Sequence, residues 1–204
     1  MGIYSGTVSF TRYFVEGDSP EPFNDLLLNK LREFAFKEII EESEIEKSMG
    51  WVSVNNMFDT DFSDLNFKKG PFISFTLRVD TRTISPQILN AYLLKEELEY
   101  KKETQKERIY KKERDMLKDK VVVKLLKKIP VQPHLYDLCW ALDKNILYLF
   151  STSPKICDEF RDFFRKSFSL RLIPISPYTT AEKLINSKEG KEALENIEPK
   201  WFIK

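Results

Sequence analysis

Two predicted helices in the middle of the chain are separated by a stretch that has no apolar face. Ser85-Pro86 is typical of a helix start, since the hydroxyl can cap the first turn and proline fits the first helical position. The buried face of this helix is expected to be Ile88, Leu89, Tyr92 and Leu93. Over residues 99–108 only charged and amide side chains occur, apart from Tyr100 and Thr104. A helix that is polar all round has nothing to pack on, so this stretch is predicted to project into solvent.

Apolar residues return at helical spacing beyond this stretch and predict a second helix that leads back to the core. The set is Val121, Val122, Leu125, Leu126 and Ile129. Pro130 and Pro133 are expected to end this helix, because proline cannot supply the backbone N–H that a helix needs. The two helices together predict a protruding charged hairpin over residues 86–129, with its turn near residues 110–115.

The rest of the chain predicts an α+β fold, with mainly antiparallel strands in one or more sheets and helices packed on them. Apolar alternation predicts strands at residues 3–15, 51–54, 72–83, 134–142, 146–151 and 170–175. Helices are predicted at residues 22–40, from residue 153 with a buried face of Phe160, Phe163 and Phe164, and over the tail. We expect a body at residues 1–178, which includes the arm at 86–129, and a C-terminal helical tail at residues 179–204.

The composition is that of a soluble globular protein. In 204 residues, 42% are hydrophobic and 32% are charged. No run approaches the roughly 18 apolar residues of a membrane span, and the N-terminus lacks the layout of a signal peptide. Cys139 and Cys157 form neither a ligand cluster nor a disulfide framework, and are expected to be buried thiols in a reducing cytosol. We therefore expect a cytoplasmic protein with no membrane contact.

The sequence offers little for catalysis. It has one histidine, His134, with no candidate nucleophile beside it, and no glycine-rich phosphate loop. Asp59, Asp61 and Asp64 alternate along one loop and could converge on a hard cation, but the glycine and the closing glutamate of a calcium loop are missing. A solvated acidic loop is the favoured interpretation, and a metal-dependent nuclease is the weaker one. We expect no enzyme, no metal and no cofactor.

Charge is divided unevenly along the chain, although the formal net charge is only +1. Residues 101–128 hold 12 Lys/Arg against 5 Asp/Glu, whereas residues 1–66 hold 5 basic against 13 acidic side chains. A segment of concentrated positive charge attracts polyanions, and nucleic acid is the commonest large polyanion in a cell. The basic arm therefore favours nucleic-acid binding.

Four lysines of the second predicted helix share one face. At about 100° per residue, one arc beside the apolar set holds Lys120, Lys124, Lys127 and Lys128. Most charge runs are solvated helix faces, but this lysine stripe contains no acidic residue and lies on a projecting arm. Because lysine is a point charge without the fork geometry that reads bases, we expect the lysine stripe to bind phosphates regardless of sequence.

A second hypothesis keeps the hairpin and changes its partner. The acidic region at residues 1–66 and the basic arm could be complementary surfaces, so that the arm docks on an acidic protein or on a second copy of the chain. The residue pattern leaves both a DNA-binding protein and a protein-interaction or self-association module open. Salt-sensitive self-association without DNA binding would favour the second.

Three short sequence motifs occur in the same order as in a known protein family. They are Met49-Gly50-Trp51-Val52, Leu117-Lys118-Asp119, and Arg165-Lys166-Ser167 leading into Leu172-Ile173-Pro174-Ile175. With a long Lys/Glu-rich helix between the first two, the chain resembles the bacterial recombination-associated protein family RdgC, to about Pro177. The resemblance implies a nucleoid-associated DNA-binding protein without catalysis. It further implies a ring-shaped homodimer around double-stranded DNA that restrains RecA-driven strand exchange by occupying DNA.

The resemblance also assigns residues. By position, Arg78, Lys118 and the pair Lys127-Lys128 correspond to basic residues of the family's strand and tip helix, so it implies that they contact DNA. The family ends its tip with Leu-Leu-Pro-Arg-Ala-Phe, whose phenylalanine is thought to wedge at DNA. Residues 125–130 stand there in this chain, and Ile129 is the candidate aliphatic wedge. The family's C-terminal part, which supplies one dimer contact, has no counterpart, so we expect a shortened member that dimerises through its arms.

Overall fold

The computed structural model describes residues 3, 6–17, 25–40, 43–62 and 68–197. Its centre is a seven-stranded sheet in the order β2-β4-β5-β6-β1-β7, with β3 paired to β4. All paired strands are antiparallel. The strands are β1 (Thr11–Glu16), β2 (Lys47–Val52), β3 (Lys68–Lys69), β4 (Phe72–Thr81), β5 (Gln132–Ala141), β6 (Ile146–Leu149) and β7 (Arg171–Pro174). The predicted antiparallel α+β fold is confirmed.

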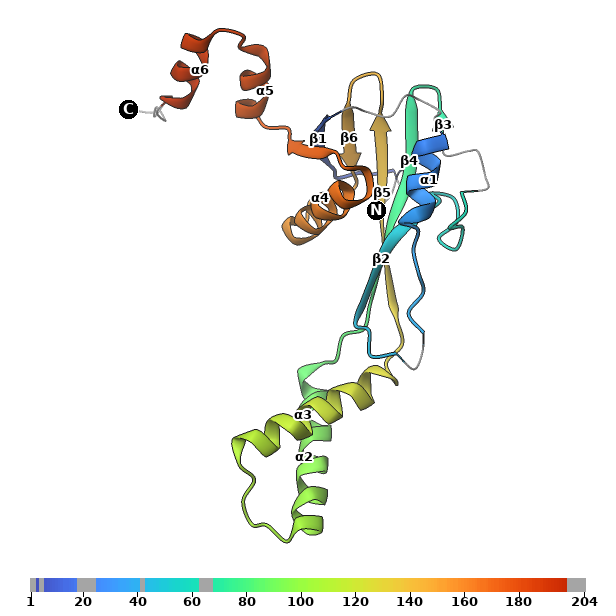
Figure 1. Ribbon diagram of the computed structural model, residues 1–204, viewed down its shortest axis with the longest axis vertical. Helices are drawn as coiled ribbons and strands as arrows, with labels where there is room; N and C mark the ends of the chain where they lie inside the picture. The colour runs from blue at the N-terminus through green and yellow to red at the C-terminus, as the bar shows by residue number, and fades with distance from the viewer. Residues whose placement is uncertain (1–2, 4–5, 18–24, 41–42, 63–67, 198–204) are drawn as a thin grey trace.

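The helices fall into three groups along the length of the molecule (Figure 1). Beside the sheet lie α1 (Asp25–Glu33) and α4 (Pro154–Phe168). The arm at one end consists of α2 (Pro86–Thr104) and α3 (Lys111–Leu126), so the predicted hairpin is confirmed. The opposite end carries α5 (Pro177–Leu184) and α6 (Lys188–Glu195). In the described part of the chain, none of these helices combines the length and the apolarity that a membrane span requires.

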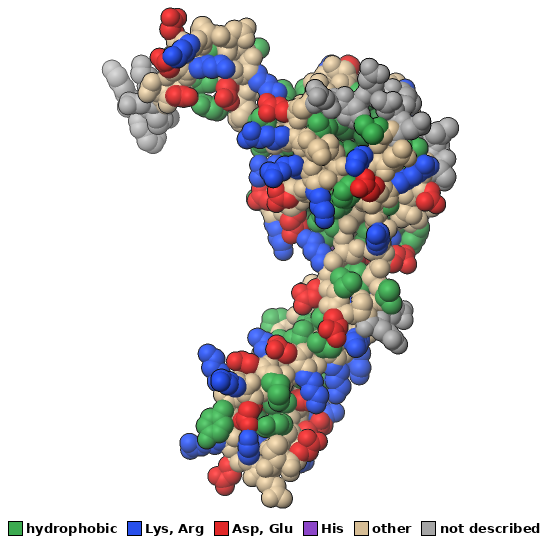
Figure 2. Space-filling view, viewed as in Figure 1, with side chains coloured by type: hydrophobic (Ala, Val, Ile, Leu, Met, Phe, Trp, Pro, Cys, Tyr) green, Lys and Arg blue, Asp and Glu red, His purple; other side chains and the backbone are tan. Residues whose placement is uncertain are grey.

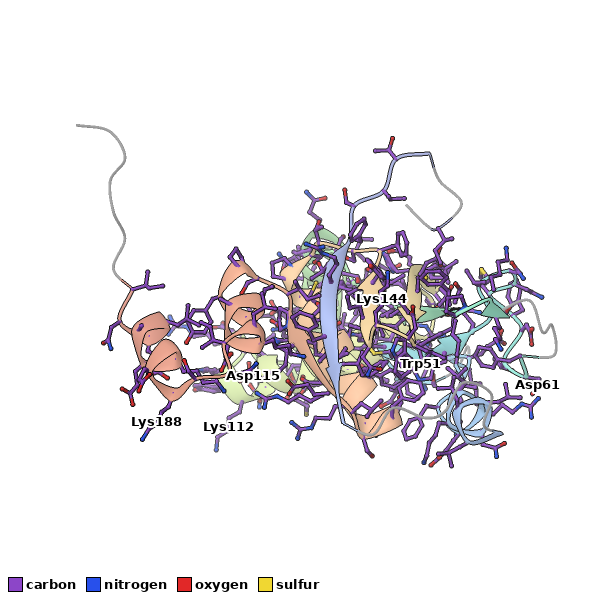
Figure 3. The ribbon with its side chains drawn as sticks, turned by 90° about the horizontal axis from the view of Figure 1, so that it is seen from above. Trp51, Asp61, Lys112, Asp115, Lys144 and Lys188 are labelled. Carbon is purple, nitrogen blue, oxygen red and sulfur yellow. The ribbon has the colours of Figure 1, made fainter. Side chains whose placement is uncertain are left out.

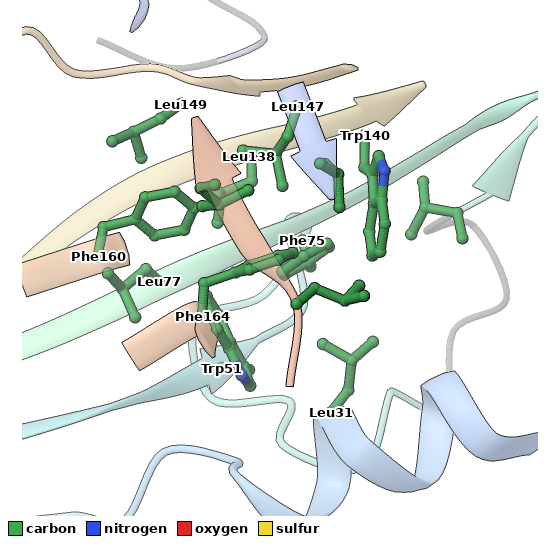
Figure 4. Close-up of a cluster of buried hydrophobic side chains, with 14 of the residues drawn as sticks. Leu31, Trp51, Phe75, Leu77, Leu138, Trp140, Leu147, Leu149, Phe160 and Phe164 are labelled. Carbon is green, nitrogen blue, oxygen red and sulfur yellow. The ribbon is translucent and has the colours of Figure 1, made fainter. Parts of the chain in front are cut away.

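The core forms where the alternating face of β4 meets the aromatic face of α4 (Figure 4). Trp51 is fully buried there, with its ring centroid 5.2 Å from that of Phe75 and 4.9 Å from that of Phe163. Its indole Nε1 donates to the Ser167 hydroxyl at 3.0 Å, which satisfies the one polar atom of the side chain. The predicted aromatic face of α4 is confirmed, since Phe160 and Phe164 are also fully buried.

The helix expected at residues 22–40 is shorter than predicted. Among the described residues, α1 ends at Glu33 and the chain then pairs with the edge of β2. The Phe36 N–H donates to the Trp51 carbonyl at 3.0 Å. A Cβ at Gly50 would lie 2.2 Å from Phe36 Cα, so only glycine allows this approach. The unpaired backbone groups at the edge of β2 form hydrogen bonds with this segment and hold it extended. Helical periodicity alone could not predict that pairing.

Other predicted elements differ from the structure mainly at their ends. Of the strand expected at residues 3–15, residues 4–5 lie outside the described residues, and among the others strand begins at Thr11. The strand expected at residue 51 begins at Lys47. The hairpin around residues 143–145 and the strand before Ile175 are confirmed. Cys139 and Cys157 are half-buried rather than buried. Residues 22–24 of the predicted helix and 198–204 of the tail lie outside the described residues.

The arm is an insertion between two adjacent central strands. The pairing of β4 with β5 runs from Phe72 opposite Ala141 to Thr81 opposite Gln132. Residues 82–131 therefore leave and re-enter the sheet at one point, where the molecule narrows (Figure 2). Both ends of the arm are thus fixed by the register of the longest strand pair, which sets where its side chains lie relative to the body.

Candidate nucleic-acid interface

A small apolar contact joins the two arm helices near the sheet. Only Leu93 of α2 is a buried apolar residue, and it faces a set on α3 made of Leu117, Val121, Leu125 and Leu126. Ile88 and Tyr92 were expected to be buried but are 45% and 42% exposed. The reason is that the apolar stripe of α2 is wider than the one helix available to cover it. The arm is therefore joined by a narrow apolar contact and by polar pairs.

The polar stretch of α2 does have a packing partner, contrary to the sequence-based expectation. Arg114 Nε of α3 lies 2.8 Å from a carboxylate oxygen of Glu97 on α2. The Glu113 carboxylate accepts hydrogen bonds from the Tyr100 hydroxyl at 3.0 Å and from the Tyr110 N–H at 2.9 Å, and it also pairs with Lys106. The polar faces of the two helices therefore pair with each other across the hairpin.

The turn of the hairpin lies at residues 105–110, earlier than the predicted residues 110–115. Gln105 ends α2 in a left-handed conformation at φ 52°. Glu113, at the third position of α3, caps the new helix by accepting the Tyr110 N–H. Hydrogen bonds from Lys106, the Tyr110 backbone and Tyr100 lower the pKa of Glu113 to about 2. The carboxylate is therefore fully ionised at neutral pH and holds the start of α3.

The lysine stripe is exposed as predicted, but only Lys120 and Lys124 lie within α3, since Lys127 and Lys128 follow its last residue, Leu126. The lysine stripe also has an acidic partner that the sequence did not reveal. Lys120 Nζ lies 2.6 Å from one oxygen of Glu96, and Lys124 Nζ lies 3.8 Å from the other. The hydrogen bond between them lowers the pKa of Glu96 and raises that of Lys120, so both stay charged. The acidic partner is on α2, one helix away. Two of the four lysines of the lysine stripe therefore share one carboxylate.

The remaining lysines differ in what surrounds them. Lys127 and Lys128 are exposed, and neither makes an ion pair with any residue that the structure describes. Lys118 is exposed as well, but at about 100° per residue it lies roughly 130° around α3 from the middle of the lysine stripe. A flat surface that contacts the lysine stripe would therefore not contact Lys118 at the same time.

Arg78 is buried rather than presented on a surface. Its guanidinium donates to both carboxylate oxygens of Asp80, at 2.8 and 2.7 Å, and to the Met57 carbonyl at 3.1 Å. The rings of Phe36 and Phe58 lie over it, with centroids 4.1 and 5.4 Å from Cζ. Its charge is thus compensated inside the protein. Arg78 and Asp80 are two residues apart on one strand and share a face, a signal of this pairing that the sequence analysis did not use.

A cleft of about 550 Å³ lies where the arm joins the sheet, and we call it the basal cleft. Its charged lining is Glu38, Arg78, Asp80, Arg82, Lys127 and Lys128. Ile129 is half-buried in the same wall. This residue therefore lies at the base of the arm and not at its distal end, which is the turn at residues 105–110. The sequence analysis did not assign Arg82. This residue lies four positions after Arg78 and just beyond the end of β4, so its closeness to a basic residue already assigned could have indicated it.

The acidic loop lies apart from the arm. Asp61 is on the opposite side of the molecule from Lys112 and Asp115 (Figure 3). The Asp59 carboxylate accepts the Asp61 N–H at 3.1 Å, so one of the proposed metal ligands caps its own turn. Asp64 lies outside the described residues. Within the described ranges, no three His, Cys, Asp or Glu side chains are grouped so as to hold a metal ion.

These features define a class of α+β protein that carries a charged helical hairpin between two central strands of an antiparallel sheet. A family model described as "Putative exonuclease, RdgC" matches residues 15–187, which is 173 of the 204 residues. The chain belongs to the RdgC family. No curated protein matches it. Family membership supports a recombination-related role.

Proposed function

We propose that the protein binds double-stranded DNA without regard to sequence and acts in recombination by occupying DNA, so that RecA-type strand exchange is restrained on the covered stretch. The observation that carries this proposal is the lysine stripe: four exposed lysines on α3 and just beyond its C-terminal end, of which only Lys120 and Lys124 form ion pairs with described residues, both with Glu96. Such a group of exposed cations attracts phosphates strongly at low salt.

The dimensions of the lysine stripe suit a duplex. The span from Lys120 to Lys128, which ends in the turn just after α3, is about 12 Å long at the helical rise of 1.5 Å per residue. B-DNA carries one negative charge per roughly 1.7 Å of axis, so this length faces about seven phosphate charges. Lysine contributes charge without base-reading geometry, which supports binding to any sequence. Lys and Arg side chains also cover much of the visible face of the arm, with acidic ones among them (Figure 2).

The decisive experiment is a fluorescence anisotropy titration of unrelated duplexes at several salt concentrations. We expect equal affinities and, for about five neutralised phosphates, a log-log salt slope of −4 to −5. Reversing the lysine stripe with K120E, K124E, K127E and K128E should abolish binding. The matched control reverses four exposed lysines of the body and tail, with K144E, K155E, K188E and K191E. Equal losses in the two variants would mean that only total charge matters and would overturn the assignment.

Binding without cleavage is part of the proposal, and the same duplex tests it. The labelled DNA is incubated with the protein in Mg²⁺ and, separately, in EDTA. Intact DNA in both supports a protein that acts by occupancy. Magnesium-dependent loss of the label that Asp61→Ala abolishes would instead support a nuclease that uses the acidic loop.

Exposed apolar side chains on α2 support a second candidate, self-association through the arm. Leu94 and Leu98 are 59% and 53% exposed, and Met116 of α3 is 55% exposed. Such residues on a projecting element favour a partner surface, and a homodimer through two arms would also bring two lysine stripes together. Light scattering at two salt concentrations, with and without DNA, tests this. A monomer at every concentration would refute it.

A further inference from the structure

We propose that the basal cleft is a binding site for one phosphate group, with Arg82, Lys127 and Lys128 as its cationic wall. This inference deepens the proposed function and rests on it for the source of the phosphate, which is either the DNA backbone or a free phosphorylated small molecule. It adds Arg82, a residue that neither the sequence pattern nor the family resemblance assigned.

Arg82 is the observation that points to a ligand. Its side chain is only 5% exposed, and its terminal nitrogens donate to the carbonyls of Ser43 at 2.9 Å and Ile40 at 3.2 Å. No carboxylate among the described residues pairs with it, and its Nε is buried without a hydrogen-bond partner. Buried cations are normally paired, and an unsatisfied buried donor in a folded protein calls for a bound ion or water.

The contrast with Arg78 sharpens this argument. Both arginines are buried and both line the basal cleft, but Arg78 has Asp80 as a bidentate counter-ion. Across the charged lining, four cations stand against the two carboxylates of Glu38 and Asp80, a difference of +2. With Asp80 already engaged, only the exposed Glu38 is left against Arg82 and the two lysines. Counted over the residues that the structure describes, the cleft therefore carries excess positive charge, which favours an anion.

The lysines alone would not justify a site. A lysine at a helix C-terminus is favourable in itself, since it faces the negative end of the helix dipole, and Lys127 and Lys128 follow the last turn of α3. That effect does not account for Arg82, which comes from the other side of the cleft just after β4. The register of β4 with β5 brings the two sides together, so the strand pairing of the fold fixes the positions of both walls of the cleft.

The test is an NMR titration of the whole protein with inorganic phosphate at constant ionic strength. The Arg82 Nε–H signal and the Ile129 and Val131 amides report on the cleft. We expect saturable shifts confined to these groups, and a loss of phosphate affinity of about tenfold or more in the K127Q/K128Q variant. Both lysines are exposed, so this variant should keep the fold. The matched control, K111Q/K112Q, removes two exposed lysines from the other end of α3 and should change nothing.

Shifts that stay linear in phosphate, or an equal loss in both variants, would overturn the site and leave DNA binding to be judged by the anisotropy titration. The source is resolved by adding duplex DNA to the phosphate-saturated protein. Displacement of phosphate identifies a backbone phosphate as the occupant. Retention of phosphate on DNA-bound protein identifies a free phosphorylated ligand. Saturable phosphate binding by a protein that does not bind DNA would support the cleft and refute the proposed function.

Discussion

The carboxylate of Glu96 on α2 lies 2.6 Å from the ammonium group of Lys120 on α3. The same carboxylate also lies 3.8 Å from Lys124, so one acidic residue restrains half of the lysine stripe. A polyanion that approaches α3 has to compete with Glu96 for these two cations. Glu96 therefore joins α2 to α3 within the arm and also lowers the affinity of the lysine stripe for phosphate.

Glu96→Gln is expected to tighten DNA binding about two- to fivefold, because Glu96 is buried but its lysine partners are exposed, and releasing a lysine from a surface ion pair is worth roughly 0.2–1 kcal/mol. Anisotropy at low salt measures the change. Glu99→Gln is the control, since it removes the same charge from the same helix, but the ion pair of Glu99 is the 4.0 Å contact with Lys95 and not a contact with the lysine stripe. An equal gain in both variants would show that the net charge of α2, and not the Glu96 pairing, sets the affinity.

Lys127→Gln and Lys118→Gln are expected to differ in their salt dependence. Each removes one exposed charge from the α3 region, but only Lys127 belongs to the lysine stripe. The log-log slope should become less steep by about 0.9 for Lys127→Gln and remain unchanged for Lys118→Gln. Equal changes would indicate contacts spread around α3 and would favour the family-based assignment of Lys118.

Glu113→Gln is expected to loosen the distal end of the arm in a pH-dependent way. The folded state lowers the pKa of Glu113 from 4.5 to about 2. Its stabilising effect is therefore fully present above pH 4.5 and is lost as the pH falls toward 2. Hydrogen exchange at the Tyr110 amide should be faster in the variant at pH 6, and the difference should vanish near pH 2. Glu107→Gln, in the exposed turn, should match the unmodified protein throughout. A constant difference across this range would contradict the assignment.

Gly50→Ala is expected to destabilise the body by about 3 kcal/mol or more, because the added methyl meets backbone atoms of Phe36 that have no room to move. Denaturant unfolding followed by tryptophan fluorescence measures the change. Gly6→Ala is the control, since a Cβ added there would meet nothing within 4 Å beyond its chain neighbours, and it should stay within about 0.5 kcal/mol. Similar midpoints for the two variants would refute the close approach of residue 36 to β2.

Asp80→Asn is expected to cost about 3–5 kcal/mol, since it leaves the buried Arg78 cation without its counter-ion. Adding Arg78→Gln should recover much of that loss and keep DNA affinity within about twofold, because the guanidinium is already engaged by protein groups. Unfolding and anisotropy on the single and double variants measure both effects. A clear loss of DNA affinity in the double variant would place Arg78 on the DNA.

The sequence by itself determined the local elements. The alternation around Phe75 and the Ser85-Pro86 start each predicted a structure that was found, whereas the polar stretch at 99–108 predicted the projecting arm but not its packing against α3. These features depend on the spacing of residues that are neighbours along the chain, and that spacing is set by the geometry of a strand or a helix. The basic arm and its lysine stripe were predicted for the same reason.

Only the tertiary structure decided which charged side chains remain available to bind a ligand. Glu96 meets Lys120 across the hairpin, Asp80 neutralises Arg78, and Arg82 and Lys127 line the same basal cleft. The first and last of these join residues more than 20 positions apart, and the arginine pairing depends on the aromatic rings that bury it. No period in the sequence records such distances. They follow from how the strands align and the helices pack, because the strength of a charge depends on its spatial neighbours and its exposure to water.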